Sequence, residues 1–227
     1  TLLARSSGNV GIGIASPAYQ LDVSSIINTA HARGFHQSGS SVLTSSGTIT
    51  LVGLNAGLNN TGSQNTFVGK DAGFSNTTAS SNTFVGWNAG YSNLIGQSNT
   101  FLGQEAGWKN TTNSNTFLGY QAGMSNTSGG TNTFIGFQAG YRNTTANANI
   151  FIGDYAGSAL NTGGNNLFIG FSAGGANTSG YNNVAAGWDA AFTNTTGADN
   201  VFLGYRAGYA NSVGARNIFI GSNVGDL

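Results

Sequence analysis

The 227-residue chain has no cysteine, a single proline and few charged residues. Without cysteine it can form neither disulfide bonds nor thiolate metal sites. Seven Lys and Arg residues balance seven Asp and Glu residues, so the formal net charge is zero and only 6% of the residues are charged. Nucleic acids and anionic membrane surfaces are bound through clustered cations, and this composition argues against both as partners.

Long hydrophobic runs are also missing, since no stretch reaches the length of a membrane span. The first residues do not form a signal peptide, which suggests a fragment or a processed chain. The chain does contain 39% hydrophobic residues with fourteen phenylalanines, which is enough to bury a core and excludes a disordered chain. Its 37 glycines do not stand at every third position, so the chain is not collagen-like.

Glycine instead marks an internal repeat. The stretch Asn65–Gly69, Asn-Thr-Phe-Val-Gly, returns at intervals of 16 or 17 residues. A repeat this short cannot bury its own apolar face and has to stack on its neighbours. We therefore predict an all-β fold, a parallel β-solenoid (β-roll) of about eleven coils, roughly 50 Å long at about 4.8 Å per coil. The glycines that close the copies are Gly53, Gly69, Gly86, Gly103, Gly119, Gly136, Gly153, Gly170, Gly187, Gly204 and Gly221.

The repeat divides the chain into two predicted parts. Residues 1–46 lie outside it and are expected to form an N-terminal β connector or cap, and residues 47–227 form the solenoid domain. Residues 24–41 show no period and are interpreted as a connector. Alternation predicts two short strands before them, one on Val10, Ile12 and Ile14, and one on Tyr19, Leu21 and Val23.

Most coils have the same order of residues around the closing glycine. Asn stands four residues before it, Phe two before and Val, Leu or Ile one before, while Ala follows three after and a second Gly four after. This order predicts a strand, a tight bend, a second short strand and a polar turn. Trp87, Ala89 and Tyr91 would then share one face of the second strand. The Asn columns are expected to hydrogen-bond from coil to coil, and seven Asn-x-Ser/Thr sequons are interpreted as turn composition unless the source is a eukaryotic secreted protein.

The first strand is apolar on both faces. Phe and the aliphatic residue after it are adjacent, so they point to opposite sides of the sheet, and a sheet with two apolar faces is covered on both. One row lines the coil interior, and the other needs a partner to cover it. Closed symmetry favours three chains around an axis, although a dimer is also permitted. The sequence leaves open which row faces the axis. The predicted core and oligomer ladder consists of Phe84, Val85, Phe101, Leu102, Phe117, Leu118, Phe134, Ile135, Phe151 and Ile152.

Catalytic and metal sites find little support, and we expect no enzyme activity and no cofactor. His31 or His36 with Asp22 could be drawn as a dyad, but all three lie outside the repeat. Asp71 and Glu105 share a position two coils apart, roughly 10 Å by coil spacing, which indicates a solvated face rather than an acid–base pair. A ligand surface is a better hypothesis, because aromatic rings near a coil edge can stack on a sugar. The candidates are Trp87, Tyr91, Trp108, Tyr120 and Tyr141.

One coil departs from the repeat around Gly187. Ala185 and Ala186 replace the Phe and the aliphatic residue, and Ser158 and Gly175 remove aromatic residues from the two coils before it. Such large-to-small changes cost about 2–5 kcal/mol each unless neighbours refill the space. We expect amide exchange to be faster in residues 158–192 than in 84–120. The candidates to refill the space are Trp188, Tyr181 and Phe192.

The repeat resembles those of a known family. Asn-Thr-Phe-Val-Gly with its following Ala-Gly is similar to the Asn-Ser-Val-Ala-Ile-Gly coils of the β-roll heads of trimeric autotransporter adhesins, and more similar to the repeat regions of phage-type tail fibres. Gly8–Gly13, Ser16-Pro17 and Leu21–Val23 resemble the segment that often precedes such repeats. The resemblance covers about Gly8–Gly225 and implies a homotrimer of parallel rolls with a role in surface attachment.

These observations predict a trimeric fibre shaft or head, of a tail fibre or surface adhesin, that binds a host or a surface without catalysis. Its expected partners are further copies of itself and a cell-surface glycan or protein receptor. The expected location is extracellular, on a virion, a phage-tail-like particle or the bacterial cell surface. A filament-forming structural protein and an ice-binding β-solenoid are the alternatives. Ice binding is suggested by a threonine column (Thr66, Thr83, Thr100, Thr116 and Thr133), which becomes aliphatic from Ile150 onward.

Overall fold

The computed structural model describes residues 49–225 and, before them, five strands of the chain. The chain divides into two compact units, Thr1–Gly34 and Phe35–Leu227. The five early strands are β1 (Leu2–Ala4), β2 (Val10–Ile12), β3 (Leu21–Val23), β4 (Phe35–Gln37) and β5 (Ser40–Ser46).

The first unit contains a three-stranded sheet in the order β1-β2-β3. β1 pairs antiparallel with β2, and β2 pairs parallel with β3. β2 and β3 confirm the two strands predicted from alternation, while Ile14 and Tyr19 lie outside the described residues. β1 was not predicted, because three successive apolar or small residues show no alternation.

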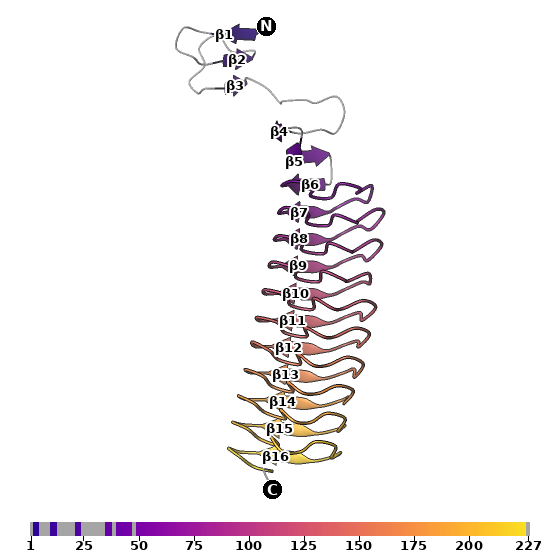
Figure 1. Cartoon of the computed structure of the whole chain (residues 1–227), viewed down its shortest axis with the longest axis vertical. Coiled ribbons are helices and arrows are strands. Elements are labelled where there is room, and N and C mark those ends of the chain that lie inside the picture. The colour runs from indigo at the N-terminus through magenta and orange to yellow at the C-terminus, as the bar shows by residue number, and fades with distance from the viewer. Residues whose placement is uncertain are drawn as a thin grey trace. The chain divides into compact units, whose positions relative to one another are not determined.

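The second unit contains a 13-stranded sheet that runs from β4 to β16. Strands β6 to β16 are eleven parallel strands, one in each coil, and they form a solenoid of about ten turns with no helix among the described residues. Figure 1 shows them stacked along one side of the solenoid, with the turns on the other. Their bounds are β6 (Ile49–Val52), β7 (Thr66–Val68), β8 (Thr83–Val85), β9 (Thr100–Leu102), β10 (Thr116–Leu118), β11 (Thr133–Ile135), β12 (Ile150–Ile152), β13 (Leu167–Ile169), β14 (Val184–Ala186), β15 (Val201–Leu203) and β16 (Ile218–Ile220).

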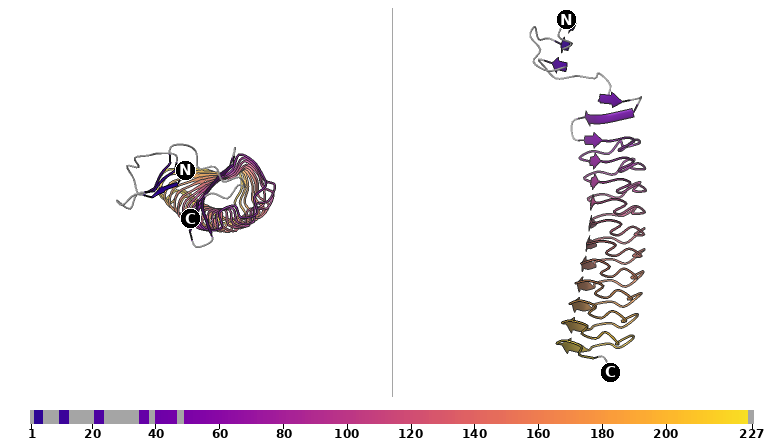
Figure 2. Two further views of the ribbon diagram at one scale, coloured as in Figure 1. Left: turned by 90° about the horizontal axis from the view of Figure 1, so that it is seen from above. Right: turned by 60° about the vertical axis from the view of Figure 1, so that its left-hand side comes forward.

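The register places equivalent residues of successive coils side by side. Phe117 of β10 lies beside Phe101 of β9 and Phe134 of β11, and the neighbouring columns keep the same order. The end-on view in Figure 2 shows the coils lying over one another. The predicted parallel β-solenoid is therefore confirmed.

The N-terminal end of the parallel stack is closed by antiparallel strands. β5 pairs antiparallel with β6, and β4 pairs antiparallel with β5. A strand at the edge of a sheet leaves a row of backbone groups unpaired, and β5 satisfies that row for the first coil. The connector predicted over residues 24–41 is wrong at Phe35–Gln37 and at Ser40 and Ser41, which are strand residues.

The predicted second strand is wrong, because the residues after each closing glycine form turns. Asn88 and Gly90 have φ angles of 56° and 59°, and the same two positions are left-handed in most of the other coils. A left-handed residue cannot continue an extended strand, so the side-chain alternation is lost. Ala89 is fully buried while Trp87 is 45% exposed, and the two do not share a face.

The phenylalanine column forms the centre of the solenoid. Eight of its members, from Phe67 to Phe168 and at Phe202, have no exposed surface. The rings of Phe84 and Phe101 stack with centroids 4.8 Å apart and planes 5° apart. The second glycine of the coil makes room for this column, because a Cβ at Gly90 would lie 2.5 Å from the ring of Phe84.

Buried asparagines that immediately precede the strands join the coils. The Oδ1 atom of Asn115 accepts a hydrogen bond from the backbone N–H of Asn132 at 2.9 Å, and its Nδ2 donates to the carbonyl oxygen of Gly129 at 3.0 Å. The backbone N–H of Asn115 donates in turn to Oδ1 of Asn99 at 2.9 Å. This pattern repeats up to Asn217, which confirms the predicted hydrogen bonding from coil to coil.

The substitution Asn115→Asp is expected to lower the free energy of unfolding by about 2–4 kcal/mol at neutral pH. Aspartate keeps the acceptor but loses the donor, so it places a buried carboxylate oxygen against the carbonyl oxygen of Gly129. The matched control is Asn113→Asp, because Asn113 is exposed and uses only Oδ1, which accepts from the N–H of Gln97 at 2.7 Å. Thermal unfolding followed by circular dichroism compares the two variants, and equal losses would contradict the role of the ladder.

A second asparagine column contains most of the sequons. Six of the seven sequon asparagines are fully buried, and only Asn59 is exposed. A glycan cannot occupy a buried side chain, so these six sequons are incompatible with glycosylation of the folded coil. The buried ones are Asn76, Asn110, Asn126, Asn143, Asn177 and Asn194.

The substitution Gly86→Ala is expected to lower the free energy of unfolding by about 3 kcal/mol or more. Gly86 has a φ of 137°, and a Cβ there would lie 2.4 Å from the carbonyl oxygen of Gly103 in the next coil. Gly130→Ala is the control, since a Cβ at Gly130 meets nothing closer than 3.5 Å and its φ lies outside the positive range. Urea unfolding should leave the control within about 1 kcal/mol of wild type. A Gly86→Ala protein of wild-type stability would contradict the close coil-to-coil approach.

In the coil closed by Gly187, the space of the missing phenylalanine is partly filled by a different residue from those predicted. Ala185 takes the place of the ring between Phe168 and Phe202 and is fully buried. In the same coil Ala191 replaces the second glycine. A Cβ at the equivalent Gly174 would lie 2.4 Å from the Phe168 ring, so the methyl group of Ala191 fits only because its own coil lacks that ring.

The predicted refilling by Trp188 and Tyr181 is wrong, because these side chains are 53% and 50% exposed. Trp188 stacks instead on Phe171 outside the core, with ring centroids 4.4 Å apart. Phe192 is half-buried and stacks on Tyr209 at 5.5 Å. The space left by the missing ring is thus reduced by a buried methyl group rather than by an aromatic side chain.

Candidate functional site

The solenoid presents a sheet face that its own coils do not cover. Each strand β7 to β16 points its middle residue inward and its two outer residues outward. In β10, Phe117 is buried while Thr116 and Leu118 are exposed. We call the surface formed by the first and third residues of strands β7 to β16 the outer sheet face.

The third residues of the strands form an aliphatic column on the outer sheet face. Nine are Val, Leu or Ile, and Ala186 interrupts them. Leu102 is 44% exposed, and Leu118, Ile152 and Ile169 are 37–39% exposed. The phenylalanine row therefore lines the interior, and the aliphatic row is the one left for a partner.

The first residues of the strands form a second column on the same face. It begins with Thr66, Thr83, Thr100, Thr116 and Thr133, which are exposed or half-buried. From Ile150 onward it is aliphatic, and Ile150 itself is 43% exposed. The C-terminal half of the outer sheet face consequently has two adjacent aliphatic columns.

The five predicted ligand-surface residues fall into two columns outside the sheet. Trp87 and Tyr120 follow the closing glycine directly and are 45% and 38% exposed. Tyr91, Trp108 and Tyr141 stand five residues after it and are half-buried. Only Tyr91 and Trp108 are in ring contact with each other, with centroids 6.4 Å apart. The prediction thus combined two separate rows of rings.

The first of these columns contains more rings than were predicted. Tyr120 stacks on Phe137 at 5.1 Å, and Phe171 stacks on Trp188. Tyr155, two residues after its glycine, lies between the two pairs at 69° to Phe137 and 78° to Phe171. Aromatic residues at the position after the closing glycine were the signal that could have found this row.

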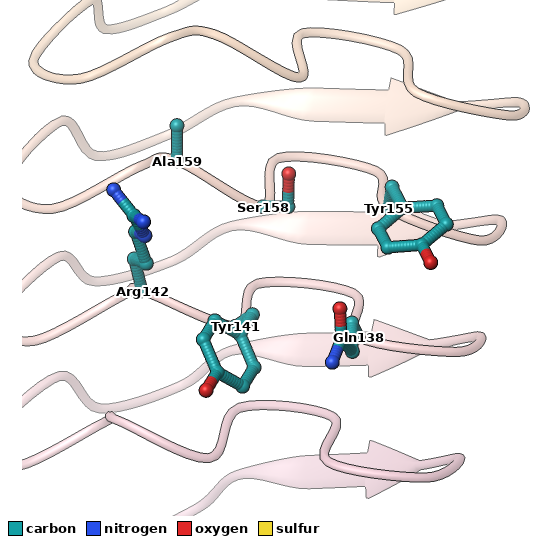
Figure 3. Close-up of a pocket in the computed structure, with 6 residues that line it drawn as sticks. All are labelled: Gln138, Tyr141, Arg142, Tyr155, Ser158 and Ala159. Carbon is teal, nitrogen blue, oxygen red and sulfur yellow. The ribbon is translucent and has the colours of Figure 1, made fainter.

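A shallow hollow of about 270 Å³ interrupts the second column. Its lining includes one predicted residue, Tyr141, together with side chains that were not predicted. Figure 3 shows that Gln138, Tyr141 and Arg142 come from one coil and Tyr155, Ser158 and Ala159 from the next. We call this hollow the Tyr141 notch.

The carboxylates of the solenoid take part in polar ladders. Oε2 of Glu105 accepts from Nε2 of Gln121 at 2.7 Å, and Oε1 of Gln121 accepts from Nε2 of Gln138 at 2.7 Å. Asp71 accepts from Nδ2 of Asn55 at 2.9 Å. Within the described part of the chain, no three His, Cys, Asp or Glu side chains are grouped so as to hold a metal ion.

His31 and the side chains of Asp22 and His36 lie outside what the structure describes, and the suggested histidine dyad stays a prediction. Among the residues with a described structure, no helix is long and apolar enough to cross a membrane.

A scan against protein-family models, a search of curated proteins and a search of solved structures each returned no match to the chain. The interpretation of its function consequently depends on the surfaces described above.

Proposed function

We propose that the protein is a homotrimeric attachment segment, the shaft or head of a tail fibre or surface adhesin, with no catalysis of its own. The observation that carries this proposal is the aliphatic column of the outer sheet face, which runs along the solenoid without a cover from its own chain. Soluble monomers rarely expose continuous apolar patches of more than a few hundred Å². Further copies of the chain are the partners that would cover the column along its full length.

The free energy gained by covering the aliphatic column is large enough to support association of several chains. Full burial of a Val, Leu or Ile side chain contributes about 1.5–3 kcal/mol. Residues such as Leu118 and Ile152 are already more than half buried, so covering the remainder contributes roughly 0.5–1 kcal/mol for each. Summed over the column and the aliphatic half of its neighbour, this gain is comparable to the roughly 4–15 kcal/mol cost of association.

Closed symmetry explains how identical stripes cover one another. Parallel copies around an axis along the solenoid bring the same stripe of every copy to that axis. Three copies agree with the resemblance to tail-fibre and adhesin repeats. Such an assembly acts outside the cell, on a virion, a phage-tail-like particle or a bacterial surface, and its receptor is a cell-surface glycan or protein.

Ice binding is the second candidate, and the exposed column from Thr66 to Thr133 is the observation that favours it. The aliphatic residues from Ile150 onward favour an interface instead, because a surface matched to ice would be expected to persist along the sheet.

The two functions are separated by retention and thermal hysteresis. Fluorescently labelled protein is expected to be retained on a panel of bacterial cells or on a glycan array at micromolar concentration, and to show no thermal hysteresis. Thermal hysteresis that is lost on Thr100→Tyr, without retention on cells or glycans, would overturn the attachment proposal.

A further inference from the structure

We infer that the Tyr141 notch is a binding site for an acidic monosaccharide unit. This assignment names the ligand class of the attachment role and rests on that proposed function. It starts from the column of residues five positions after each closing glycine, in which neighbouring rings stack from coil to coil. Phe74 and Tyr91 do so with centroids 5.0 Å apart and planes 4° apart, and Phe192 and Tyr209 at 5.5 Å and 9°.

The ring of Tyr141 stands alone in this column. Met124 occupies the position before it, and Ser158 and Gly175 occupy the next two positions, so no ring stands on either side. Among the described residues no aromatic ring contacts Tyr141. The ring is therefore not covered by another ring of the column, and it lines the hollow together with Ser158 and Ala159 of the next coil. The C–H face of a sugar ring fits against such an aromatic face.

Polar side chains also line the hollow. Figure 3 shows the Arg142 side chain extending toward the coil that carries Ser158 and Ala159. Arg142 is exposed and has no carboxylate partner within the described residues, whose ion pair is Lys70–Asp71. Gln138 uses Nε2 to donate to Gln121, which leaves its Oε1 as an acceptor in the notch.

The side chains of Arg142 and Gln138 indicate which chemical class of ligand the notch would bind. A guanidinium group binds a carboxylate through two parallel hydrogen bonds, so an unpaired Arg142 favours an anionic ligand. A few polar groups beside a ring that offers its face are the usual composition of a small-molecule site. The volume of about 270 Å³ is just below the roughly 300–1,000 Å³ range of such sites, so the notch holds one sugar ring. Because its lining comes from two successive coils, the notch is a local site rather than a continuous groove.

The test uses the full chain with N-acetylneuraminic acid and D-glucuronic acid as probes, and D-glucose and D-galactose as neutral comparisons. Saturation-transfer NMR should show binding of an acidic sugar. Its Kd should be on the order of 1 mM, because a ligand of this size buries little surface. Ser158→Tyr places a ring beside Tyr141, as Tyr91 lies beside Phe74, and should weaken binding about tenfold or more while the protein stays folded. Arg142→Gln should weaken it to a similar extent.

Lys109→Gln is the control, because Lys109 occupies the position of Arg142 in another coil, where it lies 5.7 Å from the Trp108 ring and outside the notch. This variant should bind the acidic sugars like wild type. Equal binding of neutral sugars, equal binding of a triaspartate peptide, or binding that survives Ser158→Tyr would overturn the assignment. Absence of saccharide binding by protein that is retained on cells would remove the notch and leave the attachment proposal intact.

Discussion

The substitutions Phe117→Glu and Leu118→Glu are expected to have opposite consequences, although the two residues are adjacent. Phe117 is fully buried, and its ring lies 4.9 Å from the rings of Phe101 and Phe134. A glutamate there would lose both contacts and bury a carboxylate without a partner. The resulting loss in the free energy of unfolding is expected to exceed about 5 kcal/mol. The coil is expected to unfold, with loss of the β-sheet circular dichroism signal or recovery of the protein only in inclusion bodies.

Leu118→Glu is expected to leave the coil folded and to separate the subunits. Leu118 is 39% exposed on the outer sheet face, so a charged side chain can reach water in the single chain. In a closed assembly the same substitution brings one negative charge from every copy to the axis, which opposes association. Light scattering should show a fall to the mass of one chain, with an unchanged circular dichroism spectrum.

Thr145→Glu provides the control for both variants, because Thr145 is exposed in the polar turn and away from the strands. It should keep the wild-type mass and spectrum. A Leu118→Glu protein that keeps the mass of the wild-type assembly would contradict the assignment of the outer sheet face as the interface. A folded Phe117→Glu protein would contradict the buried phenylalanine column.

The second large effect is expected in the coil closed by Gly187. Ala185→Phe alone should destabilise the protein by about 1–3 kcal/mol, because the new ring would meet the methyl group of Ala191. The double variant Ala185→Phe with Ala191→Gly should be about 2–4 kcal/mol more stable than wild type. It restores the stacked ring between Phe168 and Phe202 and removes an alanine with a φ of 54°.

A double-mutant cycle measures this coupling by urea unfolding of the wild type, the two single variants and the double variant. Ala191→Gly alone is expected to change stability by less than about 1 kcal/mol, because relief of the left-handed alanine offsets the lost methyl group. The interaction energy between the two sites should exceed about 3 kcal/mol. Additive effects would show that Ala191 does not occupy the space of the missing ring.

The parallel stack could be predicted from the sequence because its cause is periodic. A closing glycine at every sixteenth or seventeenth residue and a Phe two positions before it define one strand in each coil, and identical strands pair in register. The adjacency of Phe117 and Leu118 also predicted two apolar faces. Which of them is internal could not be predicted, because both residues are hydrophobic and only the position of the turns decides it.

The turns after the closing glycine could not be predicted from hydrophobic alternation. Asn88 and Asp71 are residue types that tolerate a left-handed backbone, but Glu105 and Tyr155 adopt it at the same position. The tertiary stack imposes that conformation, because the backbone N–H of Gly90 donates to Ala106 of the next coil at 2.9 Å whatever side chain stands nearby. Hydrophobic alternation therefore placed Trp87 on one strand face with Ala89 and Tyr91, but these residues form a turn and share no such face.

The position of the Tyr141 notch could not be predicted from the sequence, and the aromatic ligand surface stays a prediction. Aromatic residues such as Tyr141 were expected to offer a surface for a sugar, and Tyr141 does line the one notch discussed above. The notch itself results from rings that are missing at Ser158 and Gly175, and it becomes visible only when the coils are stacked. Arg142 carried no signal in the sequence, because a single cation in a turn is usually solvated.

The central claim is that identical chains cover the outer sheet face, and the mass of the wild-type protein tests it most directly. Size-exclusion chromatography with multi-angle light scattering at micromolar concentration should give about 69 kDa, three chains of 23.0 kDa. A mass of about 46 kDa, two such chains, would contradict the threefold arrangement. A stable, soluble species of 23.0 kDa would contradict the claim itself.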